Sequence, residues 1–111
     1  MTSFKDRGRA FEAKFAQDEE LAFRIMARRN RLVGEWAAQL MQLTREETEA
    51  YAKSIVQADF EEAGDEDVVR KLLGDLVSAG VDMDERRVRA ALGDMAAEAR
   101  RQFMQQHQQQ Q

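Results

Sequence analysis

The sequence lacks cysteine and proline altogether, and only one of its 111 residues is histidine. Without cysteine, disulfide bonds and thiolate metal sites are excluded. The helix formers leucine, alanine, glutamate, glutamine, arginine and methionine dominate, and no run alternates apolar and polar residues as strands do. No apolar run approaches the roughly 20 residues that a bilayer-spanning helix needs, and no signal peptide is recognisable. We therefore expect an all-α, cytoplasmic protein that does not insert into a membrane.

Residues that could carry catalysis are also scarce. The lone histidine, His107, lies in a glutamine-rich end that reads QQHQQQQ. The serines Ser3, Ser54 and Ser78 have no recognisable base near them in the sequence, so a nucleophilic triad is not available. The glycines are single residues rather than a phosphate-binding loop. These observations predict a protein that is not an enzyme and that has no catalytic residues and no required cofactor.

Local signals delimit the first two of four predicted helices. Asp18, followed by two glutamates, is a helix-capping residue, so the first helix is expected to run from about Asp18 to Met41. Nothing in the sequence forbids the helix from continuing backwards through residues 1–17. Thr44 and Glu47 form a capping box at the start of the second helix. Gly64 is expected to end that helix in a left-handed conformation.

The next two helices are delimited in the same way. Asp65 is expected to cap the third helix, and Gly80 to end it. The fourth helix follows Asp82 and Glu85, a second capping box, although Asp84 competes as the cap. The apolar stripe of the third helix is expected at the centre of the core and consists of Val68, Val69, Leu72, Leu73, Leu76 and Val77.

Short connections between amphipathic helices predict antiparallel packing, and so a compact four-helix bundle over residues 18–104. The aromatic residues Trp36, Tyr51 and Phe60 are assigned to its core rather than to a ligand site. Residues 1–17 are expected to be a flexible N-terminal arm, disordered or fraying in the free protein. Residues 105–111 are expected to be a disordered glutamine-rich tail, since they have no means of burying surface.

The net charge of −4 is distributed unevenly. Residues 1–41 carry eight basic and six acidic side chains, whereas residues 44–67 carry two basic and nine acidic ones. The acidic middle disfavours nucleic acid as a partner. A basic patch precedes it and consists of Arg24, Arg28, Arg29 and Arg31. This patch could pair with the protein's own acidic helix, with an acidic protein surface, or with the phosphates of a nucleotide.

An acidic cluster lies where the second helix ends and the third begins. It consists of Glu61, Glu62, Asp65, Glu66 and Asp67. Oxygen ligands suit calcium and magnesium, but the spacing does not match an EF-hand loop. Helix capping by Asp65 and solvation of the glutamates explain the cluster, and we expect no metal site.

The arm is the remaining candidate. Its phenylalanines Phe4, Phe11 and Phe15 are spaced by seven and four residues, so a helix would place them on one side. Four basic residues accompany them: Lys5, Arg7, Arg9 and Lys14. Phenylalanines on a charged segment suit insertion into a partner's groove. The alternative is that Phe11 and Phe15 fold back on the bundle.

Four blocks of the sequence, in order, read DRGRAFEAKFAQDEELAFR, ARRNRLVGEWAA, EAYAKSIVQADFEEAGDEDVVRK and DLVSAGVD. Together they resemble the zeta subunit of the alphaproteobacterial F-type ATP synthase over about residues 4–89. The resemblance implies a four-helix bundle with a mobile N-terminal inhibitory segment. It implies that this segment becomes helical and enters a catalytic interface between the alpha and beta subunits, near the gamma stalk, and so stops ATP hydrolysis.

Carried over to this sequence, the resemblance implies a partner-binding arm. In that arm Phe4, Phe11 and Phe15 would fill apolar pockets, and Lys5, Arg7, Arg9 and Lys14 would meet acidic residues of the partner. The protein would then sit at the inner face of the plasma membrane, held there through the synthase. Two alternatives stay open. One is a small nucleotide-sensing bundle with weak ATP or ADP binding at Arg24, Arg28, Arg29 and Arg31, and the other is a generic helix-docking adaptor.

Overall fold

The computed structural model describes residues 3–61 and 64–109, and places the side chains of residues 18–59 and 64–105. The described residues form four α-helices and no strand. They are α1 (Ser3–Leu40), α2 (Arg45–Glu61), α3 (Glu66–Ser78) and α4 (Glu85–Gln109). The prediction of an all-α, four-helix fold is confirmed. Within the described residues, no helix is long and apolar enough to cross a membrane.

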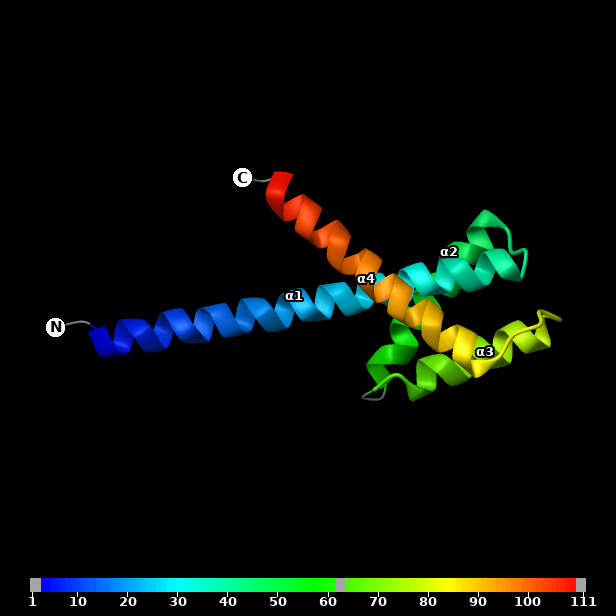
Figure 1. Cartoon of the computed structure of the whole chain (residues 1–111), viewed down its shortest axis with the longest axis horizontal. Coiled ribbons are helices and arrows are strands. Elements are labelled where there is room, and N and C mark those ends of the chain that lie inside the picture. Colours follow the sequence, from blue (N-terminus) through cyan, green and yellow to red (C-terminus); the bar gives the residue numbers. More distant parts are fainter. Residues whose placement is uncertain (1–2, 62–63, 110–111) are drawn as a thin grey trace.

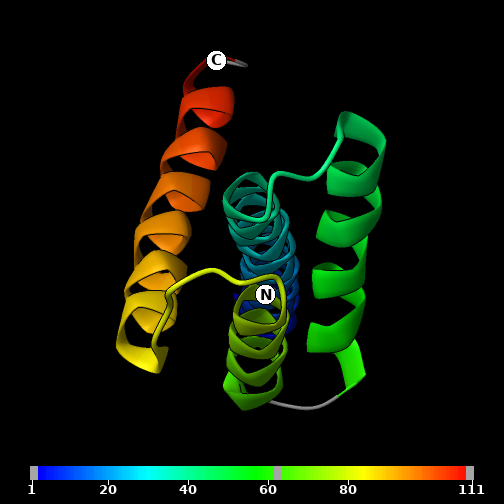
Figure 2. The same cartoon turned by 90° about the vertical axis from the view of Figure 1, so that its right-hand side faces the viewer.

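The helices are arranged around α1, which packs mainly against α2 and α4, while the short α3 contacts all three of the other helices. The view along α1 shows it between the other two long helices (Figure 2). The side view shows the N-terminal part of α1 projecting well beyond the body, and the C-terminal part of α4 diverging from it (Figure 1). These extensions account for the elongated shape, which measures 67 × 30 × 23 Å.

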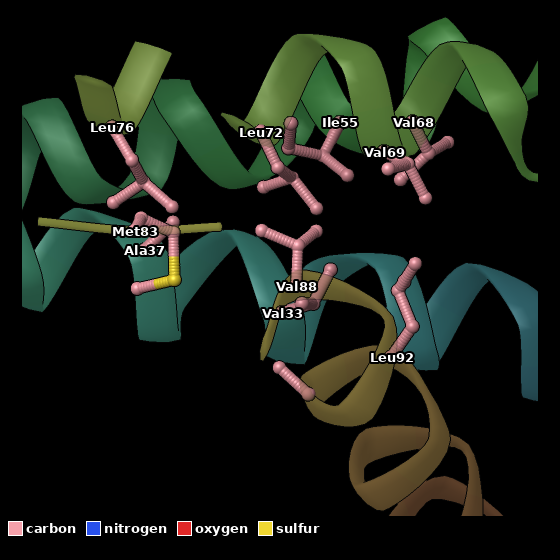
Figure 3. Close-up of a cluster of buried hydrophobic side chains, with 11 residues drawn as sticks. Val33, Ala37, Ile55, Val68, Val69, Leu72, Leu76, Met83, Val88 and Leu92 are labelled. Atoms are coloured by element: carbon pink, nitrogen blue, oxygen red, sulfur yellow. The ribbon is translucent and has the colours of Figure 1, made fainter. Parts of the chain in front are cut away.

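The core lies where all four helices meet, in the half of the molecule remote from the projecting end. Its centre is formed by fully buried aliphatic side chains from every helix, including Val33, Ile55, Leu72 and Val88 (Figure 3). Met83, from the segment between α3 and α4, covers one end of this cluster. Trp36 and Tyr51 pack against it as partly buried residues, as predicted. Phe60 lies outside the described side chains.

The local signals at the helix ends explain most of the boundaries. The capping box is formed as predicted: Thr44 Oγ1 accepts a hydrogen bond from the Glu47 backbone N–H at 3.2 Å, and Glu47 Oε1 accepts one from the Thr44 backbone N–H at 2.8 Å. The second hydrogen bond lowers the pKa of the Glu47 carboxyl. Gly64 and Gly80 have φ angles of 91° and 83°, the left-handed conformation in which glycine meets no steric penalty.

Two of the predicted caps differ in the structure. Of the two starts proposed for the first helix, the structure has the earlier one, so Asp18 lies inside α1 rather than at its cap. Asp65 stands at the N-terminus of α3 but forms no capping hydrogen bond through its side chain, because that side chain pairs with Arg29 instead. At α4, the competing cap Asp84 accepts a hydrogen bond from the Arg87 N–H at 2.8 Å.

The predicted apolar stripes extend further than the buried surface. Val77, assigned to the centre of the core, is 55% exposed at the last turn of α3, so that assignment is wrong. Leu40, at the last turn of α1, is also exposed. Both residues lie in the last turn of a helix, on a side that is not covered, although other residues of the same turns, Leu76 in α3 and Ala37 in α1, are fully buried.

The ends of the chain are helical in this structure. Helix α1 begins at Ser3 and so includes the predicted arm, and α4 ends at Gln109 and so includes most of the predicted tail. That these segments fray or lose their helix in the free protein stays a prediction.

Close packing between α1 and α2 depends on Gly34. A Cβ atom at this position would lie 2.8 Å from the Cα atom of Ala52, a distance that side chains cannot tolerate. Gly34 therefore permits α1 and α2 to approach each other, with Ala52 and Ile55 packed directly over it. By contrast, a Cβ added at Gly74 or Gly93 would meet nothing within 4 Å.

Ion pairs cover the exposed faces of the helices. Along α4, Glu98 pairs with Arg101, and Arg89 links Glu85 to Glu66 of α3. The hydrogen bonds from Arg101, and then from Gln102, lower the pKa of Glu98 to about 2. These pairs connect neighbouring turns and, through Arg89, the starts of α3 and α4.

Candidate functional site

The projecting end of α1 is the candidate site. Residues 3–17 continue α1 without interruption and extend away from the other helices (Figure 1). A helical backbone places positions 4, 11 and 15 on one side, because seven and four residues are close to two turns and one turn. The side chains of Phe4, Lys5, Arg7, Arg9, Phe11, Lys14 and Phe15 lie outside the described ones, so their predicted roles stay predictions.

Where α1 enters the body, its surface is still largely apolar. Phe23 is 54% exposed and Leu21 is 45% exposed, although both are large hydrophobic residues. On the same turn an exposed ion pair links Glu20 and Arg24 at 2.6 Å. Exposed pairs of this kind contribute at most about 1 kcal/mol to stability. The base of the projecting helix therefore presents apolar surface that the body leaves uncovered.

Part of this apolar surface forms a groove between α1 and the C-terminal end of α2. The groove has a volume of about 560 Å³. It is mainly apolar, with Phe23 and Met26 from α1 and Val56 from α2 among its lining. Among the described side chains, three acidic residues line it, Glu19, Asp59 and Asp65, and no basic residue does. Its chemistry suits a segment that combines apolar and basic side chains.

Beneath the groove, a buried polar network fixes α1 to the start of α3 and the end of α2. Arg29 is 4% exposed and Asn30 is 1% exposed. Arg29 donates through Nε and Nη2 to Asn30 Oδ1 at 3.1 and 2.8 Å, and Nη2 also donates to Asp65 Oδ1 at 3.0 Å. Asn30 Nδ2 in turn donates to Asp59 Oδ2 at 2.8 Å.

The sequence did not predict this network, although Arg29 belongs to the basic patch described above. Buried charges are stabilised only when paired and hydrogen-bonded, and Arg29 meets both conditions. The network lies one helical turn into the body from Met26, and so holds α1 in place near the point where it leaves the other helices. Its signal in the sequence is a basic residue and an asparagine in the middle of an otherwise apolar helix face.

The rest of the basic patch is largely paired within the protein. Arg31 bonds to Glu49 of α2 at 2.5 Å and lies 3.6 Å from Glu35. The hydrogen bond from Arg31 lowers the pKa of Glu49. With Arg29 in the buried network and Arg24 paired to Glu20, three of the four arginines have acidic partners. Arg28 has no ion pair among the side chains that the structure describes.

These ion pairs agree with the interpretation in which the basic patch pairs with the protein's own acidic residues. They do not test nucleotide binding, and weak ATP or ADP binding at Arg24, Arg28, Arg29 and Arg31 remains a proposal. Arg28 is the member whose charge is not paired with a carboxylate among the described side chains.

The acidic cluster is likewise engaged with arginines. Glu66 accepts two hydrogen bonds from Arg89, both at 2.9 Å, and Asp67 lies 3.3 Å from Arg70. Glu61 and Glu62 lie outside the described side chains. Among the described residues, no group of three acidic, histidine or cysteine side chains is placed to hold a metal ion.

Comparisons with known proteins found a matching family and a similar solved structure. A family model described as ATPase inhibitor subunit zeta matches residues 1–102, which include both the projecting end and the body. A protein solved by solution NMR is 45% identical to this chain, with a TM-score of 0.67, over 76% of this chain and 95% of the other. No match was found among the curated proteins.

Proposed function

The chain belongs to the ATPase inhibitor subunit zeta family, and from this premise we propose that its N-terminal arm blocks ATP hydrolysis by the F-type ATP synthase. The arm, residues 1–17, inserts as a helix into a catalytic interface between an alpha and a beta subunit, near the gamma subunit. The protein is a regulatory subunit rather than an enzyme, since the family is one of inhibitors.

The observation that supports this proposal most is the projection of α1. Residues 3–17 extend beyond the body, and at 1.5 Å per residue they form a rod about 22 Å long. Such a rod is narrower than the molecule as a whole, whose two shorter dimensions are 30 and 23 Å, so it can enter an interface that the rest of the molecule cannot enter. The family match includes these residues, so the sequence of the arm is part of what the family model describes.

Insertion would be driven mainly by the phenylalanines. Fully burying one such side chain contributes about 1.5–3 kcal/mol, so Phe4, Phe11 and Phe15 together supply roughly 5–9 kcal/mol before the costs of association. Any helical structure already present in the arm reduces the free energy that is needed to order the arm on binding. Lys5, Arg7, Arg9 and Lys14 would steer the arm towards acidic residues of the partner, and this contribution would weaken as salt concentration rises.

The body has a different role in this proposal. It is too wide to follow the arm, so it stays outside the interface and determines how far the helix enters. The buried network of Arg29, Asn30, Asp59 and Asp65 keeps α1 fixed to the body during insertion. Rotation of the gamma subunit in the hydrolytic direction then stalls against the inserted arm, whereas rotation in the synthetic direction releases the arm. Through the synthase, the protein sits at the inner face of the plasma membrane.

The test is inhibition of the cognate synthase's ATPase by variants of the full chain. Phe11→Ala with Phe15→Ala should raise the half-inhibitory concentration by roughly 100-fold, because each truncation removes about 1.5 kcal/mol or more of burial. Leu40→Ala is the matched control, since Leu40 is an exposed apolar residue at the opposite end of α1. It should inhibit like the unmodified protein.

The location of the arm needs a second measurement. A photo-crosslinking residue at position 15 should capture the alpha or beta subunit, whereas the same residue at position 40 should capture neither. Unchanged inhibition by the double phenylalanine variant would remove the anchoring role, and crosslinks made only to other subunits would place the arm elsewhere.

A further inference from the structure

We propose that the groove between α1 and α2 is a docking site for the protein's own arm, which folds back into it when no partner is bound. The groove is the mainly apolar surface lined by Phe23, Met26 and Val56, with Glu19, Asp59 and Asp65 among its acidic lining residues. In the folded-back state, α1 ends near residue 18 and the arm runs antiparallel to the remainder of α1.

The chemistry of the arm complements that of the groove. Residues 3–17 contain four basic and two acidic side chains, together with three phenylalanines. From the part of the chain whose side chains are described, the groove supplies three carboxylates, no basic residue and an apolar floor. Opposite charges favour this contact and disfavour the docking of an acidic segment. Arg29 lies close to Asp65 and Asp59, and these two carboxylates with one guanidinium leave one net negative charge beneath the groove. Glu19 adds a second negative charge to the lining, so the groove still attracts a basic arm.

The sequence also supplies a place for α1 to begin again. Asp18, followed by Glu19 and Glu20, is a strong helix-start signal, although α1 runs straight through it in this structure. A helix that carries a second start of this kind can end before it and resume at Asp18, whose side chain can accept a hydrogen bond from one of the exposed backbone N–H groups. The same chain therefore supports two states, one with α1 continuous and one with α1 starting at Asp18.

The lengths of the two segments match. The groove follows α1 from Glu19 to Asn30, a rise of about 17 Å. The arm from Phe4 to Phe15 has the same rise of about 17 Å if it is helical. A reversal at residues 17–18 brings Phe11 level with Phe23, and Phe15 level with the preceding turn. The exposed aromatic surface of Phe23 is then covered by the arm's own phenylalanines.

The consequence for regulation rests on the proposed function. An arm held in the groove is not available for insertion, so the synthase must compete with the groove for it. Docking therefore lowers the apparent inhibitory strength by the fraction of protein in the folded-back state. Because the contact joins opposite charges, this fraction falls as the salt concentration rises.

The two states differ in a distance that can be measured on the isolated full chain. Spin labels are attached to Ser3→Cys and Gln57→Cys, since the protein has no other cysteine and Gln57 is exposed on α2. In the continuous helix, Ser3 lies about 40 Å along α1 from Asn30, whose partner Asp59 is on α2 beside Gln57. In the folded-back state the two labels lie within roughly 20 Å, since packed helices are only 8–10 Å apart.

We expect two distance populations at low salt, with the short one reduced at high salt. Phe23→Ser should remove the short population, whereas Leu21→Ser, which changes another exposed apolar residue that does not line the groove, should retain it. Circular dichroism checks that both variants keep the bundle. A single population near 40 Å, or equal behaviour of the two serine variants, would overturn the docking. Neither result would affect the proposed function, because the synthase is absent from this measurement.

Discussion

The buried network beneath the groove gives a quantitative prediction about stability. Asp59 accepts a hydrogen bond from Asn30 Nδ2 at 2.8 Å and lies 4.0 Å from the guanidinium of Arg29. Asp59→Ala would leave the Asn30 amide, on a side chain that is 1% exposed, without this partner. An unsatisfied buried donor costs about 1–3 kcal/mol. The arginine would lose one of its two carboxylate neighbours but retain Asp65 at 3.0 Å.

The two effects together predict a decrease of about 2–3 kcal/mol in the free energy of unfolding. For a chain of this size, that corresponds to a fall in Tm of roughly 10–20 °C. Glu20→Ala is the matched control, because it also removes a carboxylate paired with an arginine of α1, but one that is exposed to solvent. Its expected effect is below about 1 kcal/mol.

Urea unfolding followed by circular dichroism measures both variants under the same conditions. A third variant, Asp59→Asn, keeps an acceptor for Asn30 while removing the charge, and should lose less stability than Asp59→Ala. If Asp59→Ala and Glu20→Ala unfold at the same urea concentration, the network does not stabilise the protein as the structure indicates.

Three further predictions concern packing, pH and nucleotide. Gly34→Ala should destabilise the protein by about 1 kcal/mol or more, because its Cβ would clash with Ala52, whereas Gly93→Ala should stabilise it by about 0.5–1 kcal/mol; urea midpoints check both. The pKa of Glu98 is lower in the fold than its usual value of 4.5, so its stabilising contribution is present above pH 4.5 and is lost as the pH falls towards about 2. Glu98→Gln should therefore flatten this part of the plot of urea midpoint against pH. If ATP or ADP binds, a titration at millimolar nucleotide should first shift NMR signals around Arg28, and the absence of shifts across the basic patch would discard that proposal.

The features that the sequence predicts well are those decided by neighbouring residues. The capping box of Thr44 and Glu47 forms because both partners lie within one turn. Gly64 and Gly80 adopt positive φ angles because only glycine does so without strain. The four helices follow from the apolar periodicity, which each segment carries by itself.

The features that the sequence predicts poorly depend on residues far apart. Asp65 reads as a cap, but its side chain pairs with Arg29, which precedes it by 36 residues. Val77 continues an apolar stripe, but it is exposed on the last turn of α3, whereas its neighbour Leu76 on the same turn is fully buried. The close approach at Gly34 requires knowledge that Ala52 lies opposite. The groove likewise exists only once α1 and α2 are packed together.

The central claim is that residues 1–17 carry the inhibition. It is tested most directly by measuring ATP hydrolysis by the cognate synthase with the full chain and with a chain that begins at residue 18. The truncated protein retains the entire buried network and core, so circular dichroism should show a folded bundle. We expect inhibition by the full chain and none by the truncated one at the same concentration. Equal inhibition by both would contradict the claim and assign the activity to the body.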